Sequence, residues 1–88
     1  MKTVYRKRFL KDLAKVPLKS RKKIEEFVFI ETTKLNSIEE TKIIEKMTGY
    51  SEYYKIRFGD YRVGLKYEDE VIIFERVLHR KDIYKYFP

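Results

Sequence analysis

Hydrophobic residues near the N-terminus recur at the three-to-four-residue spacing of amphipathic helices. From Arg8 onward, the apolar positions that share one helical face are Phe9, Leu10, Leu13, Ala14 and Val16. Pro17 cannot continue that helix but can open the next one, which we expect from about Leu18 to Lys34. Residues 2–6 alternate loosely between polar and apolar side chains and predict a short strand before the two helices.

The second half of the chain changes to the two-residue period of β-strands. Candidate strands cover residues 50–58, 61–67 and 70–78. The connections between them, Gly59-Asp60 and Glu68-Asp69, are short enough to predict antiparallel hairpins.

Two shorter segments complete the expected order of elements. Ser37 and Glu40 have the spacing of a capping box, so a short helical turn is expected there, whereas Lys42–Thr48 is ambiguous. A terminal helix is expected over Lys81–Phe87. This order is typical of an α+β domain. We therefore expect one domain over residues 1–88, in which the N-terminal strand and a helical hairpin pack on an antiparallel sheet of about four strands.

Composition narrows the chemistry that the chain can support. It has no cysteine and one histidine, His79, which excludes disulfides, thiolate chemistry and a zinc site. No glycine-rich phosphate loop is present, so neither a metal nor a cofactor is expected. The longest apolar runs, Phe27–Ile30 and Val71–Phe74, are too short to span a membrane, and the N-terminus lacks the features of a signal peptide. A soluble cytoplasmic protein is expected.

The formal net charge of +7 favours polyanionic partners. Residues 1–44 carry 12 basic and 6 acidic side chains, whereas residues 45–88 carry 9 and 8. In the nearly neutral second half, basic and aromatic residues alternate. That alternation is typical of single-stranded nucleic-acid binding, where cations neutralise phosphates and rings stack on bases. A solvated, charge-rich surface is the alternative interpretation of the same composition.

Alternation within the first predicted hairpin gathers basic residues on one face. Lys55 and Arg57 lie on the same side of their strand, and Arg62 faces the same way across the turn. A solvent-facing basic side of a half-buried sheet is again the alternative. The carboxylates of residues 68–70 fall in a predicted tight turn and are interpreted as solubilising rather than as a two-metal centre.

The third predicted strand alternates less cleanly. One parity contains Ile72, Phe74, Arg76, Leu78 and Arg80. Because its first residues are apolar on both faces, we expect a central strand that is covered on both sides. Arg76 would then need a partner, such as Asp82, a carbonyl or a ligand phosphate, because an unpaired buried charge is costly. A lone histidine such as His79 is more often a structural hydrogen-bonding group than a catalyst.

A site made of cations and hydroxyl groups can still cleave RNA. The 2′-hydroxyl attacks the adjacent phosphate, the 5′-oxygen leaves, and fixed guanidinium groups stabilise the charge that builds on the phosphorane. A lysine crowded by arginines has its charged form disfavoured, so it can serve as the general base. A tyrosine can stack on a base or hold the reacting geometry. Such a scheme depends mostly on how the RNA is positioned.

Four ordered motifs carry a resemblance to a known family: Lys46-Met47-Thr48-Gly49, Tyr54-Lys55-Ile56-Arg57, Tyr61-Arg62-Val63, and the stretch from Arg76 to Tyr84. Together with the N-terminal strand and helices, they resemble the RelE-like branch of the RelE/ParE superfamily of type II toxins over residues 2–87. The resemblance implies a ribosome-dependent, metal-independent endoribonuclease (an mRNA interferase) that cuts mRNA in the A site and halts translation.

The resemblance also implies roles for individual residues. Lys55 would correspond to the lysine proposed as general base, and Arg57 takes the place of a second lysine. Arg62 and Arg80 would stabilise the phosphate, and Tyr84 would stack on the mRNA. Further RNA contacts are expected from Arg76, His79 and Lys81.

The expected partners follow from the same resemblance. They are a cognate antitoxin, mRNA, and the ribosome with its 16S rRNA, while operator DNA would be bound indirectly through the antitoxin and no membrane is involved. Two alternatives stay open: ParE-like inhibition of DNA gyrase, or a catalytically degenerate module that binds its partner and regulates transcription. The joint presence of Lys55, Arg62, Arg80 and Tyr84 favours RNA cleavage.

Overall fold

A single mixed sheet organises the computed structural model, which describes all of residues 1–88. Its strands are β1 (Lys2–Tyr5), β2 (Glu45–Lys46), β3 (Tyr53–Phe58), β4 (Tyr61–Glu68) and β5 (Val71–His79). They lie in the order β1-β5-β4-β3-β2, in which β1 and β5 are parallel and all other neighbours are antiparallel. The α+β class is confirmed. The sheet exceeds about four antiparallel strands because the ambiguous segment contributes β2 and because β1 joins in parallel.

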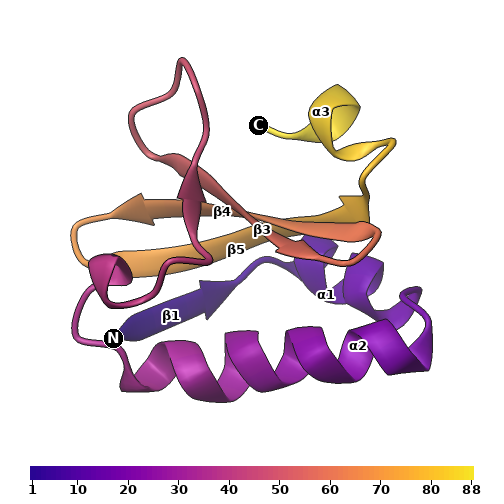
Figure 1. Cartoon of the computed structure of the whole chain (residues 1–88), viewed down its shortest axis with the longest axis horizontal. Helices are drawn as coiled ribbons and strands as arrows, with labels where there is room; N and C mark the ends of the chain where they lie inside the picture. The colour runs from indigo at the N-terminus through magenta and orange to yellow at the C-terminus, as the bar shows by residue number, and fades with distance from the viewer.

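Helices cover both faces of this sheet unequally (Figure 1). The larger layer contains α1 (Lys7–Ala14) and α2 (Leu18–Glu25), which continues as the π-helical turn η1 (Glu26–Glu31) and the 3-10 turn η2 (Thr32–Lys34). The expected helix from Leu18 to Lys34 is therefore confirmed in extent. The capping box of Ser37 and Glu40 opens the short 3-10 turn η3 (Ile38–Glu40), as expected. On the opposite face lies α3 (Ile83–Tyr86), which is shorter than the expected Lys81–Phe87.

The π-helical turn is held by side-chain hydroxyl groups. Tyr5 and Thr32 both donate hydrogen bonds to the carbonyl oxygen of Val28, at 2.6 and 2.9 Å. A widened helical turn displaces carbonyl groups from the usual ladder, so they need other donors. Because Tyr5 belongs to β1, one of these bonds also ties the helix layer to the sheet.

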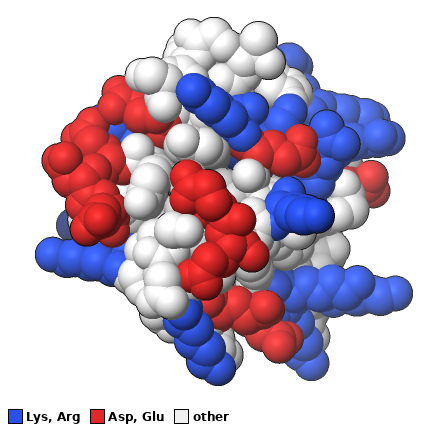
Figure 2. Space-filling model, turned by 60° about the vertical axis from the view of Figure 1, so that its left-hand side comes forward, with Lys and Arg blue, Asp and Glu red and all other residues white.

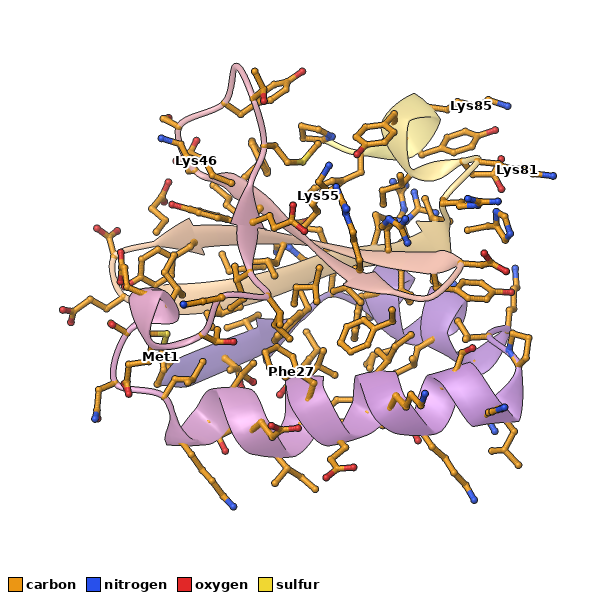
Figure 3. The ribbon with its side chains drawn as sticks, viewed as in Figure 1. Met1, Phe27, Lys46, Lys55, Lys81 and Lys85 are labelled. Atoms are coloured by element: carbon orange, nitrogen blue, oxygen red, sulfur yellow. The ribbon has the colours of Figure 1, made fainter.

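The main hydrophobic core lies between the sheet and the larger helix layer. Its members come from both layers and are Phe9, Leu13, Val16, Ile24, Phe27, Val28, Ile38, Ile56, Val63, Leu65, Ile72, Phe74 and Val77. Figure 3 shows Phe27 on the helix side of the sheet and Lys55 on the other side, towards α3. A separate, smaller cluster under α3 contains Met47, Ile83 and Phe87. The sheet face that carries Lys55 is therefore only partly covered.

A β-bulge in β5 changes which side chains face the core. Leu65 pairs with Phe74 but Gly64 pairs with Arg76, so one extra residue is inserted in β5. Beyond the bulge, Val77 is buried in the main core, whereas Arg76 lies opposite Gly64. The simple alternation expected for this strand is wrong beyond Phe74, because the bulge reverses the side on which later residues project.

Both hairpins of the sheet are closed by two-residue turns. Gly59 starts the β3–β4 turn with φ of 59°. The β4–β5 turn is Asp69-Glu70, one residue later than expected, and both residues have left-handed φ values of 52° and 63°. No helix in the chain combines the length and the apolar character that crossing a membrane would require.

Candidate active site

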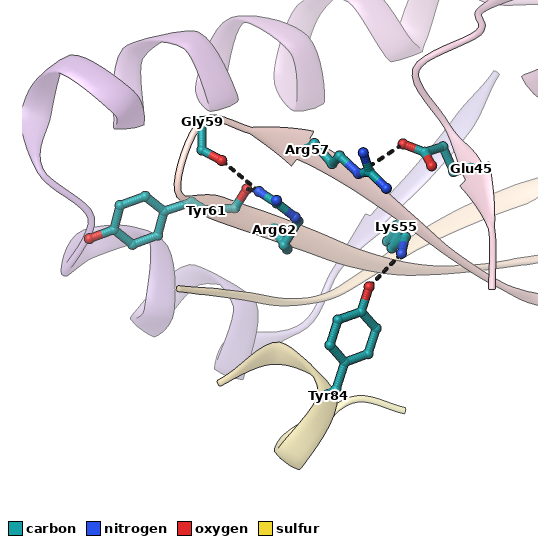
Figure 4. Close-up of polar contacts among 7 residues, drawn as sticks. All are labelled: Glu45, Lys55, Arg57, Gly59, Tyr61, Arg62 and Tyr84. Carbon is teal, nitrogen blue, oxygen red and sulfur yellow. Dashed lines mark hydrogen bonds and ion pairs between the residues drawn. The ribbon is translucent and has the colours of Figure 1, made fainter. Parts of the chain in front are cut away.

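The register of β3 and β4 gathers three basic side chains on the sheet face opposite the main core. Arg57 pairs directly with Arg62, and Lys55 pairs with Gly64. Their strand neighbours Ile56 and Val63 are fully buried, so alternation sends the basic side chains the other way. We call Lys55, Arg57 and Arg62 the basic cluster. The expectation that they share one side near the hairpin end agrees with this geometry (Figure 4).

Tyr84 of α3 lies against the Lys55 side of the basic cluster. The Lys55 ammonium donates a hydrogen bond to the hydroxyl oxygen of Tyr84, and its Nζ lies 5.0 Å from the centroid of the ring. Tyr84 is otherwise 61% exposed, so most of the ring stays free for another contact. The first turn of α3 holds it in place, because the neighbouring Ile83 is completely buried. A lysine and a tyrosine far apart in the sequence therefore meet at one point (Figure 4).

Each arginine of the site is oriented by a nearby protein oxygen. Arg62 donates from Nη1 to the carbonyl oxygens of Gly59 and Tyr61, at 2.6 and 3.0 Å. Arg57 Nε lies 3.3 Å from an oxygen of Glu45 in β2. Exposed ion pairs of this kind contribute roughly 0.2–1 kcal/mol, so a phosphate can replace them at low cost.

Arg80 reaches the same end of the sheet from β5. Its backbone N–H donates to the carbonyl oxygen of Asp60 at 2.7 Å, and its Nε lies 3.6 Å from the Asp60 carboxylate. Asp60 belongs to the β3–β4 turn beside Arg62. The structure therefore places Arg80 at the turn that borders the basic cluster.

Arg76 is held by an acid that the sequence did not indicate. Its Nε and Nη2 donate to the two carboxylate oxygens of Asp12, at 2.7 and 3.2 Å. The expected partner Asp82 lies instead 3.9 Å from Lys85. Asp12 also accepts the backbone N–H of Val77 at 3.2 Å, which caps the edge of β5 where β1 has ended. The pair joins β5 to α1 across 64 positions of the sequence, a contact that local strand alternation does not reveal.

His79 and Lys81 lie just past the basic cluster, at the end of β5. The His79 Nδ1 accepts the backbone N–H of Lys81 at 3.1 Å, and its ring meets Tyr61 edge-on at 5.5 Å between centroids. Both contacts are structural. Neither contact involves the Lys81 side chain, which has no ion-pair or hydrogen-bond partner in the protein and lies on the solvent-facing edge near α3 (Figure 3).

Sequence and fold comparisons decide the family. The sequence model of the ParE toxin of type II toxin-antitoxin systems, parDE, matches residues 4–84. Toxin RelE3 of Methanocaldococcus jannaschii is 47% identical over 89 residues, which covers 100% of both proteins. The chain is a RelE-like toxin of the RelE/ParE superfamily.

Solved structures agree with this assignment. The toxin matches a chain in the crystal structure of the RelB-RelE antitoxin-toxin complex from Methanococcus jannaschii with a TM-score of 0.81 and 45% identity, covering 97% of this chain and 99% of that one. It also matches a chain of the archaeal RelE-RelB complex from Pyrococcus horikoshii OT3, with a TM-score of 0.63 and 27% identity over 90% and 93% of the two chains. The first of these structures is described as an antitoxin-toxin complex and the second as a RelE-RelB complex.

Two interacting glutamates, Glu52 and Glu68, lie at the end of the β3–β4 pair remote from the basic cluster. Lys66 Nζ lies 3.5 Å from Glu68, and a hydrogen bond between the Glu52 and Glu68 carboxyls raises the pKa of Glu52 and lowers the pKa of Glu68. The attraction of Glu52 raises the pKa of Lys66. Figure 2 shows acidic side chains gathered on the face turned towards the viewer, with lysines and arginines around them. No group of three or more potential metal-ligating side chains forms there.

Gly64 in β4 provides the surface on which Phe87, just after α3, packs, a role that the sequence analysis did not identify. A Cβ at Gly64 would lie 2.6 Å from the ring of Phe87, so only glycine allows that ring to rest on β4. A glycine between Val63 and Leu65 in the middle of a strand is the available signal, because such glycines often mark close approach of another group. Since Gly64 is the pairing partner of Lys55, Phe87 packs directly beside the basic cluster.

Proposed function

We propose that this toxin is a ribosome-dependent endoribonuclease that cleaves mRNA in the A site without a metal and so halts translation in the cytoplasm. The observation that carries the proposal is the convergence of Lys55, Arg57 and Arg62 with the hydroxyl of Tyr84 on a partly uncovered sheet face. Cations and an exposed aromatic ring on one surface are the groups that hold a single-stranded RNA phosphate and its base.

The proposed reaction is a transesterification within the RNA. Lys55 acts as the general base and accepts the proton of the 2′-hydroxyl, whose oxygen attacks the adjacent phosphorus. The bond from phosphorus to the 5′-oxygen breaks, and that oxygen takes a proton from water, whose hydroxide is neutralised by the proton that Lys55 accepted. The products are a 2′,3′-cyclic phosphate and a free 5′-hydroxyl. Arg62 and Arg80 stabilise the phosphorane, an electrostatic contribution of roughly 3–4 kcal/mol for a well-placed donor.

The proposed roles of the other residues follow from where they lie. Arg57 and Lys81 extend the positive surface on either side of the scissile phosphate, whereas the ring of Tyr84 stacks on a base. Arg76 supports the RNA surface through β5, because its guanidinium is occupied by Asp12. The ribosome is proposed to hold the mRNA in line for attack, because a site with few acid–base groups depends mostly on positioning and an 88-residue domain offers little surface to provide it.

The proposal also includes a cognate antitoxin as partner. It rests on family membership and on the similar chain that was solved in an antitoxin-toxin complex. Basic helices α1 and α2 are proposed to contact 16S rRNA, and operator DNA is proposed to be bound indirectly through the antitoxin.

Primer extension on mRNA with a defined A-site codon tests the proposal. Purified toxin with ribosomes should give cuts at that codon, and toxin with naked mRNA should give few. A double variant, Arg62→Ala with Arg80→Ala, should abolish the cuts. Asp60→Ala is the matched control, because it removes the partner of Arg80 while leaving the guanidinium in place. Cleavage by the double variant at the parent rate would refute the site.

Inhibition of DNA gyrase is the second candidate, since the matching family model is that of the ParE toxin. The same purified protein would then block DNA supercoiling and leave ribosome-bound mRNA intact. A protein inactive in both assays would instead be the partner-binding module.

A further inference from the structure

A second basic and aromatic site lies on the far side of α3 from the basic cluster. The cavity there has a volume of about 310 Å³, and the groups that define its chemistry are Arg6, Arg8, Arg76, Glu75, Tyr53 and Tyr86. We propose that this cavity, which we call the flanking pocket, binds one nucleotide of the RNA strand next to the cleaved one. The proposal rests on the proposed function, but the proposed reaction uses none of these groups for chemistry.

The position of the flanking pocket is set by one row of paired residues across the sheet. Lys55 pairs with Gly64, and Gly64 pairs with Arg76, so the row runs from the basic cluster to the pocket. Two strand spacings separate its ends, or about 10 Å. Phe87 rests on Gly64 in the middle of the row and also lines the pocket. An RNA strand that crosses α3 can therefore occupy both sites with adjacent nucleotides.

Arg8 is the cation of the flanking pocket that remains available to a phosphate. Arg76 is occupied by both oxygens of Asp12, and Arg6 Nε lies 3.5 Å from Glu75. None of the ion pairs or side-chain hydrogen bonds of the protein involves Arg8, which projects from the first turn of α1. A guanidinium without an internal partner has no ion pair to break when it binds a phosphate, and it can do so with two parallel hydrogen bonds.

Aromatic rings supply the surface for a base. Tyr53 meets Phe87 edge-on, with 5.6 Å between ring centroids and 87° between ring planes. Tyr86, in the last turn of α3, lines the same cavity and is 62% exposed. The carboxylate of Glu75 is an acceptor only, so it suits a base edge that presents an N–H group. Stacking rings, a free guanidinium and an acceptor together fit a nucleotide.

The size and place of the cavity favour RNA over a side chain of a partner protein. Its volume lies at the lower limit of pockets that hold small molecules, which suits a single nucleotide. It opens on the same sheet face as the basic cluster, where the proposed function already places RNA. A protein ligand would need no such continuity with the cluster.

Binding of an uncleavable RNA tests the flanking pocket without ribosomes. The probe is a short single-stranded RNA of mixed sequence, fully 2′-O-methylated so that no 2′-hydroxyl can attack, and the readout is fluorescence anisotropy. Arg8→Gln and Tyr86→Ala should each weaken binding about tenfold, the effect of losing one base–aromatic stack or one well-placed phosphate contact. The matched controls are Lys34→Gln in η2 and Phe29→Ala in η1, both in the helix layer on the opposite face of the sheet, which should change affinity less than about twofold.

The outcomes separate this proposal from the proposed function. A photoreactive 4-thiouridine in the same probe should cross-link to the peptide that contains Tyr86. Binding by Arg8→Gln and Tyr86→Ala equal to that of the controls would overturn the flanking pocket, even if primer extension confirms cleavage. Weaker antitoxin binding by both variants with unchanged RNA binding would also overturn it, in favour of a protein ligand. Conversely, absence of mRNA cuts by the parent protein would refute the nuclease and leave the binding result standing.

Discussion

Lys55 and Tyr84 are separated by 29 positions in the sequence, yet the ammonium of the first donates a hydrogen bond to the hydroxyl of the second. The lysine stands on the rigid β3–β4 hairpin, whereas the tyrosine stands on a four-residue helix that a separate small cluster holds in place. The proposed site therefore combines Lys55, which the sheet fixes, with Tyr84, whose position depends on how α3 packs against the sheet.

Replacement of Tyr84 by phenylalanine tests the hydroxyl apart from the ring. We expect ribosome-dependent cleavage to fall by at least about tenfold, because the hydroxyl positions the Lys55 nitrogen through a hydrogen bond of a kind that contributes roughly 1.5–3 kcal/mol. Single-turnover cleavage of mRNA with a defined A-site codon measures the change. Tyr67→Phe serves as the control, since it removes a hydroxyl from a β4 residue that packs against the main core and does not touch Lys55. An unchanged rate for Tyr84→Phe would mean that only the ring contributes.

Gly64→Ala should detach α3 while leaving the main core folded. The new methyl group would lie 2.6 Å from Phe87, which must leave its place on β4 and take Tyr84 with it. We expect loss of cleavage with the free energy of unfolding, measured by urea denaturation, lowered by no more than about 3 kcal/mol, the upper end of the usual cost of overpacking.

The double variant Gly64→Ala with Phe87→Ala controls for the cause. Because the alanine methyl then has no ring to displace, the two substitutions should be strongly non-additive in unfolding free energy. Additive effects would show that Gly64 matters for some other reason than the seat of Phe87.

Asp12→Ala should be the most destabilising single change among the charged residues. Asp12 and Arg76 side chains are only 12% and 17% exposed, so removal of the acid leaves a poorly solvated guanidinium and an uncapped N–H at Val77. Loss of one partner of a buried pair costs roughly 3–5 kcal/mol, and the residual exposure places this pair at the lower end. Urea denaturation measures it. Glu75→Ala breaks the exposed pair with Arg6 and should cost less than about 1 kcal/mol.

Tyr67→Phe should make the fold less sensitive to alkaline pH. Burial, with help from Glu39 and Glu70, raises the pKa of the Tyr67 phenol above its ordinary value of 10.0. Above that pH the unfolded chain releases the proton while the folded chain keeps it, so stability falls as pH rises towards the folded pKa. Comparing the free energy of unfolding at about pH 8 and about pH 11 should show a smaller decrease in the variant than in Tyr50→Phe. Equal decreases would contradict this assignment.

Local sequence patterns predicted most of the elements because the signals are short-range. Pro17 separates the helices, Gly59 turns the first hairpin, and alternation places Lys55 and Arg62 on one face, all through the backbone preferences of a few neighbouring residues. The length of the π-containing helix was also predicted correctly, although its widened turn was not, since that turn depends on the Tyr5 hydroxyl reaching from β1.

Contacts between distant segments could not be predicted in the same way. The bulge in β5 is defined by the cross-strand pairing of Gly64 with Arg76, and no local pattern near Glu75 marks it. The Asp12–Arg76 pair spans 64 positions, so the nearer Asp82 looked as plausible from the sequence. The parallel pairing of β1 has the same origin. The site residues were therefore found by periodicity and resemblance, while the groups that orient them needed three-dimensional structure.

The turn at Asp69-Glu70 offers a position at which a substitution should stabilise the toxin. Two consecutive non-glycine residues there hold left-handed backbone angles, at a cost of roughly 1–2 kcal/mol each. A glycine at Glu70 would relax that geometry and raise thermal tolerance. Because the turn lies at the end of β4 remote from Arg62, the stabilised variant would keep the proposed site unchanged and would suit crystallisation on the ribosome.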